Sequence, residues 1–151
     1  MDKYILLDID GVITSEAYTR RCKAEKIQPN MFGLDWFDPQ CVEMLRRVID
    51  KTSARIVLSS SWRDLGIYRM NKVWSENSLP GELAGTTPEW VLIKKDAILE
   101  WIDGHADDKY VIIDDSDLRL QNQVRTNPVT GLTAADAELA IQILNYGPIH
   151  L

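Results

Sequence analysis

Two aspartates and a glycine that follow the first apolar run are the residues of this chain best suited to chemistry. The run Tyr4–Leu7 leads directly into Asp8, Asp10 and Gly11. Such a run predicts a buried parallel strand, and the residues after it lie at the carboxyl edge of the sheet, where open α/β folds bind ligands. Two residues apart on a strand, Asp8 and Asp10 would face the same way, so their charges require a cation or a shared proton. The simpler interpretation is an Asp-Gly turn after an edge strand.

Two further apolar runs also end in polar side chains. Arg55–Leu58 leads into Ser59–Ser61, and Tyr110–Ile113 leads into Asp114–Asp115. Taken singly, the serines are explained as capping residues and the aspartates as a solvated acidic turn. Parallel strands joined by right-handed crossovers end at the same edge of a sheet, however. We therefore expect all of these groups to converge with Asp8 on one site.

Helix signals lie between the apolar runs. Asp38-Pro39 predicts a helix start, Asp64 is expected to cap a second helix, and Asp103-Gly104 to end a third. Thr133, with Asp136 three residues later, predicts the capping box of a last helix. Strands that alternate with helices in this way predict an α/β fold in which helices cover both faces of a mainly parallel sheet.

Other parts of the chain carry weaker signals. Val124–Thr126 is expected to form a short strand, and the stretch from Gly85 to Pro88 is expected to be irregular. Residues 12–37 combine a basic segment with an aromatic and glycine cluster, which we interpret as a flap or hairpin over the site. Residues 1–151 are expected to form a single domain.

Length and composition limit the class of protein. The chain has 151 residues, of which 45% are hydrophobic and 26% charged, as in ordinary folded domains. No apolar run is long enough to cross a membrane and no signal peptide is recognisable, so we expect a cytoplasmic protein without a membrane partner. The net charge of −6 argues against stable binding of nucleic acid along its length. No pattern in the sequence predicts an oligomeric state.

A phosphate monoester is the substrate class that the acidic groups fit. Asp8 can attack phosphorus and form an aspartyl-phosphate, which divides one hard displacement into two easier ones. Asp10 can protonate the leaving alkoxide and later deprotonate water. Because a dianionic phosphate must approach several carboxylates, we expect Mg²⁺, with oxygen ligands from Asp8 and from Asp114 or Asp115.

Phosphoryl oxygens also need hydrogen-bond donors and a balancing positive charge. Ser60 and Ser61 are well placed to supply hydroxyls at a strand-to-helix turn. Lys94 or Lys95, at the start of the third helix, is the candidate cation. Taken alone, such lysines are more often exposed side chains at a helix start.

The chain resembles the haloacid dehalogenase (HAD) superfamily of aspartate-nucleophile phosphohydrolases. The four motifs of that family are matched in order by Asp8-Ile9-Asp10-Gly11-Val12, Ser60, Lys94 and Ile113-Asp114-Asp115. The chain is most similar to the HAD domain of Swiss Army Knife RNA repair proteins. That closer likeness is carried by Ser59-Ser60-Ser61-Trp62-Arg63, by the lysine followed by Ile98 and Trp101-Ile102, and by Gly131-Leu132-Thr133.

The resemblance implies a Rossmann-like, three-layer fold with a minimal flap, and a role for each matched residue. Asp8 would be nucleophile and Mg²⁺ ligand, and Asp10 would be general acid and base and lend its main-chain carbonyl to the metal. Of the remaining matched residues, Ser60 and Lys94 would bind phosphate. Asp114 and Asp115 would bind Mg²⁺. The register of the three serines, the choice between Lys94 and Lys95, and which of the two later aspartates binds metal directly all stay open.

The implied activity is a Mg²⁺-dependent phosphatase. Its substrate would be a phosphorylated small molecule or a nucleic-acid end, with a nucleotide or terminal phosphate favoured by the likeness to RNA repair proteins. The alternative is a non-enzymatic or partner-dependent module that keeps the fold and binds phosphate or metal. The presence of every motif residue argues against that alternative.

Overall fold

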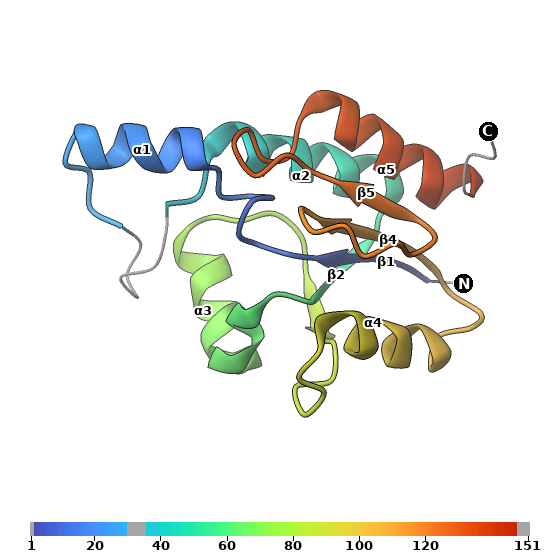
Figure 1. The fold of residues 1–151 in the computed structure, drawn as a ribbon. Coiled ribbons are helices and arrows are strands. Elements are labelled where there is room, and N and C mark those ends of the chain that lie inside the picture. Colours follow the sequence, from blue (N-terminus) through green and yellow to red (C-terminus); the bar gives the residue numbers. More distant parts are fainter. Residues whose placement is uncertain (1, 30–35, 148–151) are drawn as a thin grey trace.

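The computed structural model describes residues 2–29 and 36–147, which form a single five-stranded sheet with helices on both faces (Figure 1). The strand order is β3-β2-β1-β4-β5, and every neighbouring pair of strands is parallel. The strands are β1 (Lys3–Leu7), β2 (Arg55–Leu58), β3 (Leu83–Thr86), β4 (Lys109–Asp114) and β5 (Gln123–Arg125). β1 is therefore the central strand, with its carboxyl end in the middle of the sheet edge.

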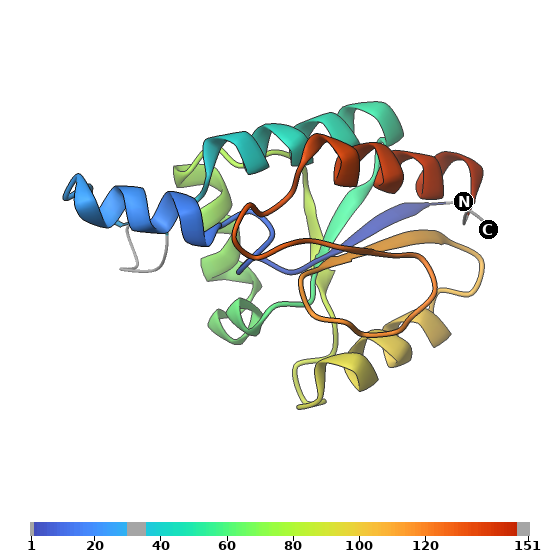
Figure 2. The ribbon, with the colours of Figure 1, turned by 45° about the horizontal axis from the view of Figure 1, so that its top comes forward.

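Helices α2 and α5 lie side by side over one face of the sheet, and α4 covers the other (Figures 1 and 2). The helices are α1 (Glu16–Ala24), α2 (Pro39–Thr52), α3 (Ile67–Glu76), α4 (Lys94–Asp103) and α5 (Ala134–Tyr146), with a short 3₁₀ helix η1 (Ser61–Leu65) after β2. This arrangement confirms the predicted three-layer, Rossmann-like α/β fold. None of the described helices is both long and apolar enough to span a membrane.

The central strand owes its continuous apolar sequence to burial on both faces. Ile5 and Leu7 belong to the larger core cluster, which also contains side chains of α2, α3 and α5. Leu6 points to the opposite face and belongs to a smaller cluster with Ile98 and Trp101 of α4. This alternation fixes which way the residues just beyond the strand end can point.

Three of the predicted helix boundaries are confirmed and a fourth is wrong. α4 ends at Asp103 with Gly104 as its C-cap residue, as predicted. The Asp38 side chain caps α2 by accepting from the Gln40 N–H, and Thr133 and Asp136 form the capping box of α5. Asp64 does not cap a helix, because it lies inside η1 and Gly66, with a φ of 85°, precedes α3 instead. A left-handed backbone of this kind is accessible to glycine without strain.

The stretch from Gly85 to Pro88 was expected to be irregular, and the first part of it is strand. β3 pairs with β2 at the edge of the sheet, with a register irregularity between Ile56 and Val57. None of its four residues is fully buried, so β3 lacks the continuous apolar run of the inner strands.

Residues 12–37 contain a helix where a flap or hairpin was expected. Ser15 caps α1 by accepting from the Tyr18 N–H, and Cys22 is the one fully buried residue of this helix. α1 therefore projects from the carboxyl edge of the sheet (Figure 1). The expected hairpin is absent from residues 12–29, and most of the aromatic and glycine cluster, residues 30–35, falls outside the described part of the chain. Whether the segment acts as a flap, and whether 1–151 is a single domain, stay predictions.

Thr133→Ala is expected to lower the free energy of unfolding by about 1 kcal/mol, because it leaves the Asp136 N–H at the start of α5 without its acceptor. For a chain of this size the loss corresponds to a fall of roughly 2–4 °C in Tm. Thermal unfolding measures it, with Ser75→Ala on the exposed face of α3 as the control. An equal effect of both substitutions would contradict the capping role.

Candidate active site

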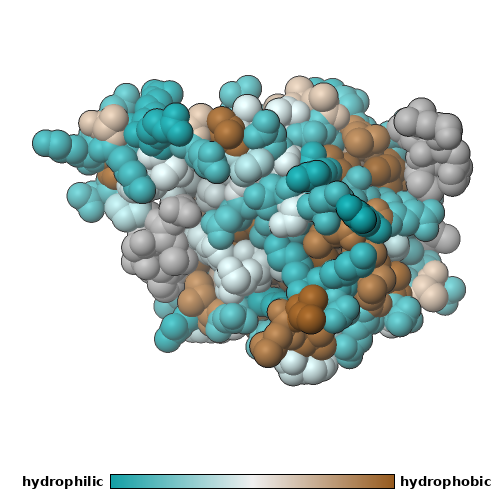
Figure 3. All heavy atoms as spheres, in the orientation of Figure 1, coloured by the Kyte–Doolittle hydropathy of each residue, from teal (hydrophilic) through white to brown (hydrophobic). Residues whose placement is uncertain are grey.

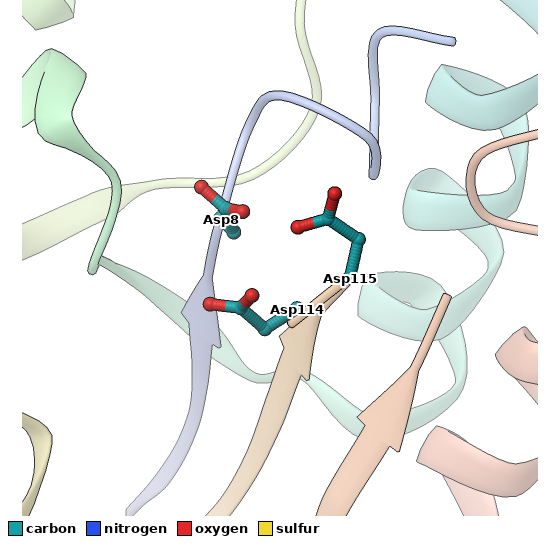
Figure 4. A group of neighbouring side chains, drawn as sticks. All are labelled: Asp8, Asp114 and Asp115. Atoms are coloured by element: carbon teal, nitrogen blue, oxygen red, sulfur yellow. The ribbon is translucent and has the colours of Figure 1, made fainter. Parts of the chain in front are cut away.

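Three carboxylates meet where β1 and β4 end (Figure 4). Asp8 follows β1, Asp114 ends β4 and Asp115 follows it, and one oxygen of each lies within 4.8 Å of the others. The side chains of Asp8 and Asp114 are only 5% and 0% exposed. Converging carboxylate oxygens of this kind are the donor set that a hard divalent cation prefers, and these three residues fit such an ion. We call them the acidic cluster.

Lys94 reaches the acidic cluster from α4, the helix that lies on the other face of the sheet from α2 and α5. Its Nζ lies 3.0 Å from Asp114 Oδ2 and 3.4 Å from Asp8 Oδ2. Lys94 is the first residue of α4, so the helix that covers this face of the sheet also delivers the positive charge. Of the two candidate lysines, Lys94 is the one that makes these contacts.

One lysine does not neutralise the two buried carboxylates. Burial and the nearby charge of Asp114 raise the pKa of Asp8 from 3.8 to about 7, and the opposing effect of Lys94 is smaller. Burial lowers the pKa of Lys94, but the carboxylates of Asp8 and Asp114 more than compensate, so its pKa lies above the ordinary value. The cluster therefore favours an additional positive charge, whether a proton or a metal ion.

Main-chain groups hold the carboxylates in place. Asp8 Oδ1 accepts from the Ile9 N–H at 2.9 Å, and Asp114 Oδ1 accepts from the Ser116 N–H at 2.9 Å. Gly11 has a φ of 78°, and a Cβ at this position would collide with the Asp115 carboxylate. A larger residue at position 11 would displace the third carboxylate, which explains the glycine of the opening motif.

Asp10 does not join the acidic cluster. β1 ends at Leu7, so Asp8 and Asp10 both lie beyond the strand, and the Asp10 carboxylate is not one of the three that converge. A shared direction of the two side chains stays a prediction. Asp10 is exposed, and its Oδ2 accepts a hydrogen bond from the Trp62 indole at 3.1 Å. A main-chain metal contact at Asp10 stays a prediction.

The three serines occupy different environments. Ser60 Oγ caps η1 by accepting from the Trp62 N–H at 3.2 Å, and Ser61 is exposed. Ser59 is 1% exposed, and its Oγ has no hydrogen-bond partner within the described part of the chain. An unsatisfied buried hydroxyl is uncommon in proteins and calls for an explanation.

Strand register places Ser59 with the acidic cluster. Leu7 pairs with Leu58 and both belong to the larger core cluster, so the next residue of each strand, Asp8 and Ser59, points to the other face. Lys94 approaches that face from α4. The sequence left the register of the three serines open, because the face to which Ser59 points follows only from the pairing of Leu58 with Leu7.

Comparison with known protein families now identifies the fold. The family model described as the HAD domain in Swiss Army Knife RNA repair proteins matches residues 4–137. The chain belongs to this family. The matched segment contains the acidic cluster, Lys94 and the serine turn. Among curated proteins and among solved structures, the searches found no match.

A buried arginine, which the sequence did not single out as a site residue, fixes the segment that leads to Lys94 in this HAD domain. The Arg63 guanidinium donates to Thr87 Oγ1 and to the Val91 carbonyl. Since Lys94 follows three residues after Val91, these bonds connect the serine turn to the start of α4. Both acceptors of Arg63 are neutral oxygens.

A pocket of about 240 Å³ lies between the acidic cluster and the start of α1, lined in part by Asp10, Asp115 and Glu16. The segment before Lys94 exposes apolar side chains, and hydrophobic residues gather over it in the space-filling view (Figure 3); they include Trp90, Leu92 and Ile93. A larger hollow of about 480 Å³ between α1, α2 and the end of α3 contains none of the cluster carboxylates.

In the metal-free protein, Asp8→Asn is expected to raise the free energy of unfolding, and by more at pH 8 than at pH 5. Because the pKa of Asp8 is raised in the folded state, wild-type stability is lost as the pH rises from 3.8 towards about 7. One pKa unit corresponds to about 1.4 kcal/mol, so the loss has an upper limit of about 4 kcal/mol. Urea unfolding in a chelator at both pH values measures it.

Asp107→Asn is the matched control, because Asp107 is exposed in the loop between α4 and β4 at the opposite edge of the sheet. It is expected to change stability by less than about 0.5 kcal/mol at either pH. If Asp8→Asn changed stability equally at pH 5 and pH 8, the folded protein would not raise the pKa of Asp8.

Proposed function

We propose that this HAD domain is a Mg²⁺-dependent phosphatase that removes a terminal phosphate monoester from a nucleotide or a nucleic-acid end. The observation that carries the proposal is the acidic cluster with Lys94 inserted between Asp8 and Asp114. The acidic cluster raises the pKa of Asp8 to about 7 and therefore costs stability. A buried group that costs stability supports a functional role for this cluster.

Asp8 is the proposed nucleophile. Its Oδ1 is held by the Ile9 N–H, and its Oδ2 lies 3.4 Å from Lys94 Nζ, so the carboxylate keeps one orientation at the sheet edge. Attack on phosphorus forms an aspartyl-phosphate and releases an alkoxide, and attack by water on that intermediate then regenerates Asp8. Mg²⁺, held by Asp8, Asp114 and Asp115 with the Asp10 main-chain carbonyl, would offset repulsion between the phosphate and these carboxylates.

Asp10 is the proposed general acid and base. It lines the pocket between the acidic cluster and α1, next to Asp115, and this pocket is where a leaving group in contact with Asp10 would lie. The carboxyl protonates the leaving oxygen in the first step and takes a proton from water in the second.

Phosphate oxygens would be held from the β2 side of the site. Ser60 and Ser61 remain the predicted ligands, and to them we add Ser59, whose buried hydroxyl is otherwise without a partner in the described residues. Lys94 contributes the positive charge that phosphoryl oxygens require. The turn that Ser60 caps is fixed by its own hydrogen bond, which favours a preformed site.

A nucleic-acid end is favoured by two observations. The family model is that of RNA repair proteins. Trp90, four residues before Lys94, is 77% exposed and offers a face on which a base can stack. We propose that the substrate is held at its end and not along its length, in keeping with the net charge of −6. Action in the cytoplasm is part of the same proposal.

The proposal predicts phosphate release from 3′- or 5′-phosphorylated oligonucleotides or nucleotides that requires Mg²⁺ and disappears in Asp8→Asn. The loss is expected to exceed 10³-fold, because asparagine cannot form the acyl phosphate. Colorimetric phosphate release over a panel of monoesters measures it, with Asp107→Asn as the active control.

The alternative, a module that binds phosphate or metal without catalysis, has a different outcome. Wild-type protein that binds Mg²⁺ by calorimetry but releases no phosphate from any member of the panel would favour it. Release that persists in Asp8→Asn would instead reject Asp8 as the nucleophile.

Replacing the serines one at a time tests which hydroxyl meets phosphate. Ser59→Ala is expected to lower kcat/KM by roughly 10-fold or more without loss of stability, because it removes a buried donor that has no partner among the described residues. Ser60→Ala should also lower the Tm, since it removes the η1 cap. Ser61→Ala serves as the exposed comparison; if it were the most damaging to kcat/KM, the assignment of Ser59 would be wrong.

A further inference from the structure

The indole of Trp62 connects the serine turn to Asp10. Its Nε1–H donates to Asp10 Oδ2 at 3.1 Å, although the two residues lie 52 positions apart. Asp10 is exposed, whereas Trp62 is 7% exposed and belongs to the larger core cluster. An exposed carboxylate is thus anchored to a side chain that the core holds.

The position of the indole is itself well determined. The Trp62 main-chain N–H donates to Ser60 Oγ, and the ring packs against Phe37 with 5.6 Å between centroids. Trp62 therefore has contacts on the serine turn and at the start of α2, and little freedom to turn away from Asp10.

An indole N–H can donate a hydrogen bond but cannot accept one. Asp10 Oδ2, which receives this bond, therefore stays an acceptor whether the carboxyl is ionised or protonated. Because the carbonyl oxygen of a protonated carboxyl is a stronger acceptor than its hydroxyl oxygen, this bond favours the transferable proton on Oδ1. The hydrogen bond from Trp62 therefore selects which carboxyl oxygen exchanges the proton, and it also fixes the direction in which that oxygen points.

We infer that Trp62 is a positioning residue for proton transfer by Asp10. The inference rests on the proposed function. In the first step the proton on Asp10 Oδ1 passes to the leaving oxygen as its bond to phosphorus breaks and the phosphoryl group moves to Asp8. In the second step Oδ1 takes a proton from the water that attacks the phosphoryl group, so inorganic phosphate leaves and Asp10 regains its proton. Oδ2 remains bonded to Trp62 throughout.

Leaving-group dependence separates this role from a structural one. 4-Nitrophenolate leaves without protonation, whereas the alkoxide of a nucleoside phosphate needs a proton, and general acid catalysis contributes typically 10²–10⁴-fold to such steps. Trp62→Phe keeps an aromatic ring and removes the donor. We expect kcat to fall at least 10-fold on a phosphorylated oligonucleotide and less than about 3-fold on 4-nitrophenyl phosphate.

Trp74→Phe is the matched control. Trp74 is 4% exposed, belongs to the same core cluster and donates its indole N–H to the Pro80 carbonyl at 2.8 Å. Its replacement also removes an indole hydrogen bond from the core, and it should affect both substrates equally. An equal loss on both substrates for Trp62→Phe, or no loss on either, would overturn the inference.

A second measurement does not depend on turnover. The ¹H–¹⁵N resonance of the Trp62 indole, assigned by its absence in Trp62→Phe, should shift in Asp10→Ala, and that of Trp74 should not. An unchanged Trp62 resonance would also overturn the inference. Wild-type protein inactive on every substrate contradicts the proposed function instead, and the spectrum then decides alone whether Trp62 holds Asp10.

Discussion

The structure depends on the placement of more negative than positive charge at the buried carboxyl edge of one sheet. Asp8 follows β1 and Asp114 ends β4, and these neighbouring strands are buried on both faces, so the two residues are only 5% and 0% exposed. Among the described residues, Lys94 is the one cation within ion-pair distance of these two carboxylates. The remaining imbalance raises the pKa of Asp8 to about 7. Fold stability and site chemistry therefore oppose each other here, as is common at functional sites.

The layers around this edge each supply one part of the site. Lys94 is the first residue of α4 and reaches the site from the face of the sheet that this helix covers. Arg63 fixes the segment before α4 by donating to the Val91 carbonyl. η1 places Trp62 against Asp10, and the backbone at Gly11 leaves space for Asp115. The groups that would bind phosphate, move the proton and hold metal thus come from separate segments that the parallel sheet brings together.

Much of this could be predicted from the sequence, and the exceptions have physical causes. The inner strands and the caps at Asp38 and Thr133 are local signals, because burial on both faces and capping depend on adjacent residues. β3 was missed because an edge strand does not require a continuous apolar run. The contact between Trp62 and Asp10 spans 52 residues and leaves no local pattern, and Ser59 could be assigned only once the register with Asp8 was known.

A covalent aspartyl-phosphate on Asp8 can be sought directly during turnover. Protein turning over a phosphorylated oligonucleotide with Mg²⁺ is quenched in acid, digested and analysed by mass spectrometry. We expect a phosphoryl adduct on the peptide that contains Asp8, removed by hydroxylamine as acyl phosphates are. Steady phosphate release with no adduct on Asp8, or with an adduct on another residue, would contradict this expectation.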